Sequence, residues 1–81
     1  MSELFAFKFI ISDHEWKSTA DKPDMQYQGC VAVAVAPDEA TARLHLAKYA
    51  AENGMGDEWL PVARVVKIQL IDGACLAWAE V

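Results

Sequence analysis

The residues of this chain that could do chemistry are a histidine between two acids and two cysteines. Asp13, His14 and Glu15 are consecutive, and such groups could bind a metal ion or act as an acid and a base. In an extended chain, however, His14 points away from both neighbours, while a metal site needs converging ligands. The other histidine, His45, is distant in the sequence. We therefore predict that these residues lie in a solvated loop and bind no metal.

Cys30 and Cys75 are the candidate nucleophiles. A reactive cysteine needs a base or a positive environment to ionise, and neither cysteine has a basic neighbour in the sequence. Both are predicted to be small buried residues on one face of a sheet. Because CxxC, P-loop, GxGxxG and GxSxG motifs are also missing, the sequence predicts neither an enzyme nor a cofactor. One alternative stays open: a ligand-binding or enzymatic domain with residues 12–28 as a lid and Cys30 or His14 as the reactive group.

Composition narrows the class of protein further. The chain has 81 residues, an apolar fraction of 54% and a formal net charge of −5, which predicts one folded domain over residues 1–81. Its acidity disfavours direct binding to nucleic acid or to an anionic membrane, since both need clustered cations. No segment approaches the about 20 apolar residues that span a bilayer, and the first residues lack the basic start of a signal peptide. We expect a cytoplasmic protein with reduced cysteines.

Hydrophobic periodicity indicates an α+β fold. We predict a four-stranded, mainly antiparallel sheet with one helix on one face, in the order β-β-α-β-β. The polar segment 12–28 is expected to be a long loop. The helix should begin with Pro37 in its first position and Asp38 and Glu39 in its first turn, and end at Asn53-Gly54. The predicted strands are residues 4–11, 29–36, 62–71 and 74–81, the last two joined by a hairpin at Asp72-Gly73.

The strand around "VAVAVA" alternates large and small residues. We predict that the valines join the phenylalanines of the first strand beneath the helix, which leaves the alanines on the opposite face. On the helix, Ala40, Leu44, Ala47 and Ala51 form the stripe expected to pack on the sheet. The alanine-rich sheet face would then need another cover, which a second copy of the chain or a partner protein would provide. A one-residue slip in register would exchange the two faces.

The residues expected to contact a partner lie in three places: on this second sheet face, on the side of the helix away from the sheet, or in a loop. Trp16 is a candidate interface anchor because tryptophan buries a large area at small entropic cost, whereas Trp59 is expected to close the core. Leu46 and Tyr49 form either a contact ridge or an edge of the core. The candidate partner-binding residues are Lys8, Trp16, Ala32, Ala34, Leu46, Tyr49, Lys67 and Gln69. The acidic loop residues available to a basic partner are Asp13, Glu15, Asp21, Asp24, Asp57 and Glu58.

In size, acidity and lack of catalytic motifs the chain is similar to small phage-encoded inhibitors, including anti-CRISPR proteins. The likeness implies a non-catalytic inhibitor, for example of a basic host complex that handles nucleic acid, while the expectation of a homodimer comes from the alanine-rich sheet face. No motif carries it, so it assigns no role to any residue. The function predicted from the sequence is therefore a small acidic protein-interaction module.

Overall fold

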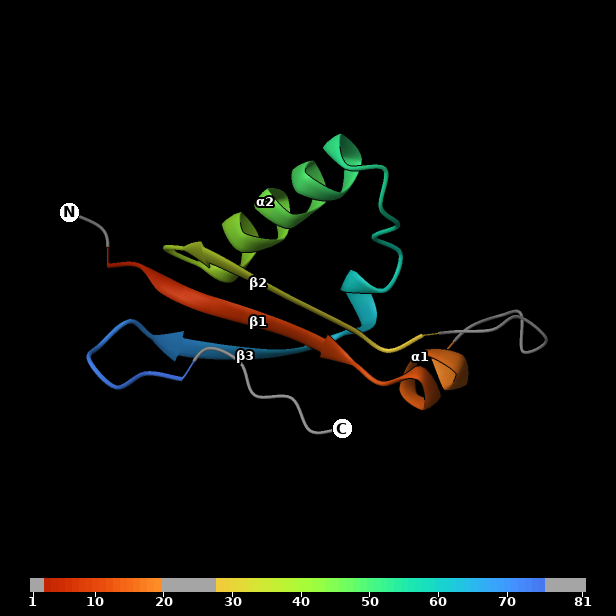
Figure 1. Cartoon of the computed structure of the whole chain (residues 1–81), viewed down its shortest axis with the longest axis horizontal. Coiled ribbons are helices and arrows are strands. Elements are labelled where there is room, and N and C mark those ends of the chain that lie inside the picture. The colour runs from red at the N-terminus through yellow and green to blue at the C-terminus, as the bar shows by residue number, and fades with distance from the viewer. Residues whose placement is uncertain (1–2, 20–27, 76–81) are drawn as a thin grey trace.

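The computed structural model describes residues 3–19 and 28–75 (Figure 1). The strands form one antiparallel sheet in the order β2-β1-β3. In chain order the elements are β1 (Phe5–Ile11), α1 (Asp13–Thr19), β2 (Cys30–Ala36), α2 (Glu39–Glu52), the 3₁₀ turn η1 (Leu60–Val62) and β3 (Arg64–Gln69).

The predicted four-stranded sheet is wrong, because the described residues form three strands. The turn at Asp72-Gly73 is present: the Ala74 N–H donates to the Ile71 carbonyl oxygen at 3.0 Å, and Gly73 has φ of 88°. Residues 74–75 after this turn are not in a strand. The remainder of the predicted fourth strand lies outside the described residues.

Helix α1 corrects a second prediction, since it occupies part of the segment expected to be a loop. Its first turn is a capping box of the S-x-x-E type. The Glu15 N–H donates to Ser12 Oγ at 3.0 Å, and the Ser12 N–H donates to Glu15 Oε1 at 3.2 Å. These two bonds satisfy backbone donors that the helix itself cannot satisfy. The sequence contains the signal for this helix start, because Glu15 follows Ser12 at the three-residue spacing of a capping box.

Helix α2 begins two residues later than predicted. Asp38 is the N-cap rather than a first-turn residue, and its carboxylate accepts the Thr41 N–H at 2.7 Å. This bond lowers the pKa of Asp38 below its ordinary value. The predicted stop at Asn53-Gly54 is confirmed: Gly54 has φ of 65°, and the Met55 N–H donates back to the Ala50 carbonyl at 2.8 Å.

Strand register decides which residues lie beneath α2, and it reverses our assignment of the faces. Directly paired residues share a face of a sheet. The structure pairs Phe5 with Ala36, Phe7 with Ala34 and Phe9 with Ala32. The alanines, not the valines, therefore lie with the phenylalanines. The physical reason is space: small residues on β2 let α2 approach closely, while the larger rings of β1 fill the volume beside it.

The face of α2 that packs on the sheet is also the opposite of the one predicted. Ala42 and Ala50 are buried and Leu46 packs against the core, whereas Ala40 and Leu44 are exposed. Figure 1 shows α2 running beside β2, on the side away from β3. Because α2 lies over β2, the core above β1 is closed by a different segment.

That segment is the turn around η1. Trp59 and Leu60 are buried against Phe9, whose side chain is fully buried. Arg43 of α2 joins the two parts of this cover: its Nη1 donates to the Leu60 carbonyl at 2.9 Å, and its guanidinium lies 4.9 Å from the centroid of the Phe9 ring. The prediction that Trp59 closes the core is therefore confirmed.

None of the described helices has the length and apolar character needed to cross a membrane.

Candidate functional site

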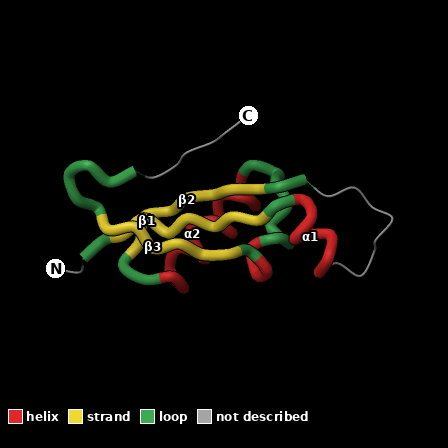
Figure 2. Tube along the Cα trace, turned by 90° about the horizontal axis from the view of Figure 1, so that it is seen from below, coloured by secondary structure: helices red, strands yellow, loops and turns green. Residues whose placement is uncertain are grey.

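The face of the sheet away from α2 carries a regular grid of mostly apolar side chains, and we call it the open face. No described helix lies on it, and Figure 2 shows the strands in front with α2 behind them. Val31, Val33 and Val35 are 56, 37 and 47% exposed. By register, the nine members of the grid are Ala6, Lys8 and Ile10 of β1, Val31, Val33 and Val35 of β2, and Arg64, Val66 and Ile68 of β3.

Two cations belong to the open face, in different situations. Arg64 lies at its margin and forms a bidentate ion pair with Glu15, with Nε–Oε2 at 3.0 Å and Nη2–Oε1 at 3.1 Å. Lys8 is central, paired in register with Val33 on one side and Val66 on the other. Within residues 3–19 and 28–75, no ion pair is found for Lys8. The centre of the open face thus carries one positive charge among valines.

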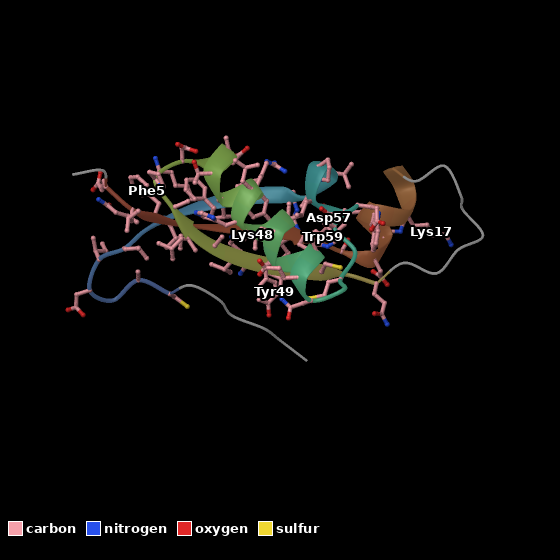
Figure 3. The ribbon with its side chains drawn as sticks, turned by 90° about the horizontal axis from the view of Figure 1, so that it is seen from above. Phe5, Lys17, Lys48, Tyr49, Asp57 and Trp59 are labelled. Atoms are coloured by element: carbon pink, nitrogen blue, oxygen red, sulfur yellow. The ribbon has the colours of Figure 1, made fainter. Side chains whose placement is uncertain are left out.

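A second surface is the groove between the outer edge of β2 and helix α2, which we call the β2–α2 groove. It has a volume of about 860 Å³. Ala32 and Ala34 line it from β2, and Tyr49 and Leu46 line it from α2. The loop that follows α2 closes one end, where Figure 3 shows Asp57 and Trp59 near the helix that bears Tyr49. The groove is therefore mostly apolar, with aromatic side chains in its walls.

The end of the groove near the start of β2 is acidic. Asp57 and Glu58 are exposed there, in the same lining as Gly29 and Cys30. In the part of the chain that the structure describes, neither carboxylate forms an ion pair. A cation entering this end would meet two exposed carboxylates.

The residues predicted to bind a partner are divided between these surfaces. Lys8 is the one member of the set that lies on the open face. Lys67 and Gln69 lie on the helix side with the phenylalanines, and the Lys67 ammonium is 3.9 Å from the centroid of the Phe5 ring. Five members of the predicted set line the groove: Trp16, Ala32, Ala34, Leu46 and Tyr49. The predicted continuous alanine-rich docking face therefore does not exist.

The acidic residues are not gathered into one cluster. Asp13 is exposed at the start of α1, where its carboxylate accepts the His14 N–H at 2.8 Å. Glu15 is held by Ser12 and Arg64. Asp57 and Glu58 lie at the groove, and Asp21 and Asp24 lie outside the described residues.

Hydrogen bonds from the side chain and backbone of Ser12, followed by the charge of Arg64, hold the pKa of Glu15 below its ordinary value. Since the folded-state pKa is lower than the unfolded one, ionised Glu15 stabilises the fold above the unfolded value of about 4.3. We expect this contribution to disappear as the pH falls through the lowered pKa. Carboxyl chemical shifts followed by NMR should show Glu15 titrating below the ordinary glutamate value of about 4.3, and Glu15→Gln should remove this part of the pH dependence of unfolding. A Glu15 midpoint at or above the ordinary glutamate value of about 4.3 would contradict the expectation.

The groups considered for catalysis are not arranged as a catalytic pair. Burial raises the pKa of the Cys30 thiol, which is opposite to the change that activates a nucleophile. Its sulfur makes a hydrogen bond of 3.4 Å to the Gln28 carbonyl, and His14 is exposed on α1. Cys75 is exposed, and neither cysteine is in a disulfide. Among the described residues, no three His, Cys, Asp or Glu side chains gather as metal ligands.

Sequence reasoning missed two contributors to these surfaces. The valines of β2 were assigned to the core, although the pairing of large with small residues across β1 and β2 could have placed the alanines there. Met55 lies in the groove and is exposed, and it was not selected because nothing in its local sequence marks a groove. The groove depends on where the chain returns after α2, which is a tertiary feature.

The chain was also compared with known proteins. It matches no protein-family model, and no curated protein or solved structure matches it either. The open face and the β2–α2 groove are therefore the features from which a function can be argued.

Proposed function

We propose that the chain is a non-catalytic protein-interaction module that associates through its open face. The observation that carries the proposal is the row of half-exposed valines Val31, Val33 and Val35 on β2, with half-exposed Val66 of β3 on the same sheet face beyond Lys8. A contiguous exposed apolar patch is uncommon on a monomeric protein and usually marks an interface. The proposal keeps the class of function predicted from the sequence and moves it to the opposite face.

A second copy of the chain is the occupant that we propose first. Most homo-oligomers are symmetric dimers, and two sheets with apolar faces can pack at about 10 Å with interdigitating side chains. Lys8 lies near the centre of such an interface, so its flexible stem must carry the ammonium to the margin. This charge should lower the affinity of the dimer, so that the two copies can dissociate.

The test is the solution mass of two matched variants. Val33→Asp places a carboxylate at the centre of the open face, and we expect it to weaken dimerisation by about a hundredfold, because an unpaired buried charge is strongly unfavourable. Leu44→Asp adds the same charge on the exposed side of α2, and it should leave dimerisation unchanged. Sedimentation velocity over a concentration series measures both, with circular dichroism to verify folding. A wild-type chain that stays monomeric throughout would contradict self-association.

Lys8 distinguishes a second copy from a foreign partner. In a dimer of two open faces, Lys8→Leu removes two like charges and should strengthen association. On an acidic partner the same substitution would remove a favourable charge pair and weaken binding. The sign of the change therefore identifies the occupant.

The biological setting that we propose is the cytoplasm, supported by the two cysteines without a disulfide. An inhibitor of a basic complex that handles nucleic acid is one concrete form of this function, supported by the net charge of −5. The alternative of an enzyme using Cys30 gains no support from the raised pKa of its thiol.

A further inference from the structure

We propose that the β2–α2 groove binds an extended peptide segment of a partner protein, which adds to the sheet as a strand beside β2 and places basic side chains at Asp57 and Glu58. The groove shares Val31 and Val33 with the open face at the edge of β2, but peptide binding does not depend on self-association there. Its occupant is a polypeptide with small apolar residues at alternate positions and arginine or lysine at its C-terminal end.

The first argument is the outer edge of β2, which pairs with no further strand among residues 3–19 and 28–75. In the order β2-β1-β3, β2 is hydrogen-bonded to β1 on one side. Alternate residues of an antiparallel edge strand direct their N–H and C=O groups away from the neighbour, where an added strand can pair with them. The sequence of β2 is CVAVAVA, with no charged residue and no proline to prevent such pairing. Addition of a peptide strand to a free edge is a recurring mode of recognition.

The second argument is the shape and chemistry of the groove beside that edge. Ala32 and Ala34 project small side chains into it, which leaves room for the side chains of a neighbouring strand. Tyr49 and Met55 are 58 and 59% exposed and line the groove, so they can close over an occupant at little cost to the fold. Every second side chain of an added strand would point to this apolar wall.

The third argument is charge. Asp57 and Glu58 line the groove, and the loop that carries them lies toward the end of the sheet where β2 begins (Figure 1). A strand that runs antiparallel to β2 brings its C-terminal end to this place. Basic residues there would compensate two carboxylates that have no ion pair within the described residues. A guanidinium can contact a carboxylate through two parallel hydrogen bonds, which adds direction to the attraction.

The experiment uses the full chain and a synthetic peptide, Thr-Val-Thr-Val-Thr-Val-Arg-Arg, acetylated and amidated at its ends. We expect binding with a dissociation constant on the order of 100 µM, as for short peptide recognition without optimised anchors. The decisive readout is amide hydrogen exchange by NMR. Exchange of β2 amides over Cys30–Ala36 should slow when the peptide binds, because strand addition protects backbone N–H groups.

Matched variants separate the parts of the proposal. Tyr49→Ala and the double variant Asp57→Asn/Glu58→Gln should each weaken peptide binding about fivefold or more. Leu44→Ala, on the exposed side of the same helix, should leave it unchanged. A peptide ending in two glutamates should bind more weakly. Val66→Asp also places a carboxylate on the open face, but Val66 is on β3 and does not line the groove. This variant should weaken dimerisation and still bind the peptide, so loss of dimerisation and loss of peptide binding are distinguishable.

Three results would overturn the proposal. One is unchanged exchange of the β2 amides at about 1 mM peptide, well above the expected dissociation constant. Another is equal affinity for the arginine-ended and glutamate-ended peptides. The third is equal loss of binding in Tyr49→Ala and Leu44→Ala, which would place the peptide elsewhere.

Discussion

Replacing Phe9 by alanine should lower the free energy of unfolding by about 3–5 kcal/mol. Phe9 is fully buried and is covered by Trp59, Leu60 and the guanidinium of Arg43, so its removal leaves a cavity that these groups cannot easily refill. A domain of 81 residues has a total stability of about 4–12 kcal/mol. The substitution therefore removes a large share of it, which urea unfolding followed by circular dichroism would measure.

Phe5→Ala is the matched control for this experiment. Phe5 is on the same face of the same strand, but it is half-buried and contacts Phe7 edge-on with Lys67 over its ring. Its loss should lower the free energy of unfolding by roughly 1–2 kcal/mol. Equal losses for the two positions would mean that the core is not centred on Phe9.

Ala42→Leu should lower the free energy of unfolding by about 1–3 kcal/mol, because extra methylene groups at a closed contact force neighbours apart. Ala42 is fully buried on the side of α2 that faces the sheet. Ala40→Leu, two residues earlier on the exposed side, should change stability by less than about 0.5 kcal/mol. Urea midpoints of the two variants give the comparison.

This pair tests the orientation of α2 directly. The stripe of Ala40 and Leu44 was the sequence-based choice for the sheet-facing side, whereas the structure buries Ala42 and Ala50. A larger loss of stability for Ala40→Leu than for Ala42→Leu would contradict the structure and favour the helix orientation predicted from the sequence.

Local sequence signals predicted the positions of several elements well. Period-two alternation located the strands that the structure gives as Phe5–Ile11, Cys30–Ala36 and Arg64–Gln69. The Asn53-Gly54 stop and the Asp72-Gly73 turn are both present. These features depend on backbone conformations that only a few residue types favour, so they can be read from short segments.

The assignment of faces failed because alternation does not say which of two sets is inside. Both sets on β2 are apolar, so the choice rested on size, and the bulky valines were placed in the core. The register instead matches each phenylalanine of β1 with an alanine of β2. That match depends on how β1 and β2 align across a long intervening segment, which local periodicity does not encode.

The candidate sites were predictable only in their residue types. Leu46 and Tyr49 were recognised as an additional apolar group on the helix, and they do line the groove. Their partner wall, formed by β2 and by Met55 to Trp59, comes from segments separate in the sequence. Such a groove exists because the helix lies to one side of the strand. The sequence of either element alone does not specify that position.

The uncharged outer edge of β2 also bears on the solubility of the chain. VAVAVA has strong β propensity, no charge and no proline, the features of segments that stack into cross-β fibrils. At the other edge of the three described strands, β3 carries Arg64 and Lys67, charges of the kind that discourage edge-to-edge pairing. Helix α2 packs against the alanine side of β2 and leaves its outer edge facing the groove. Detachment of this helix would therefore expose the most aggregation-prone part of the molecule, so the rate of fibril formation should follow the local stability of α2.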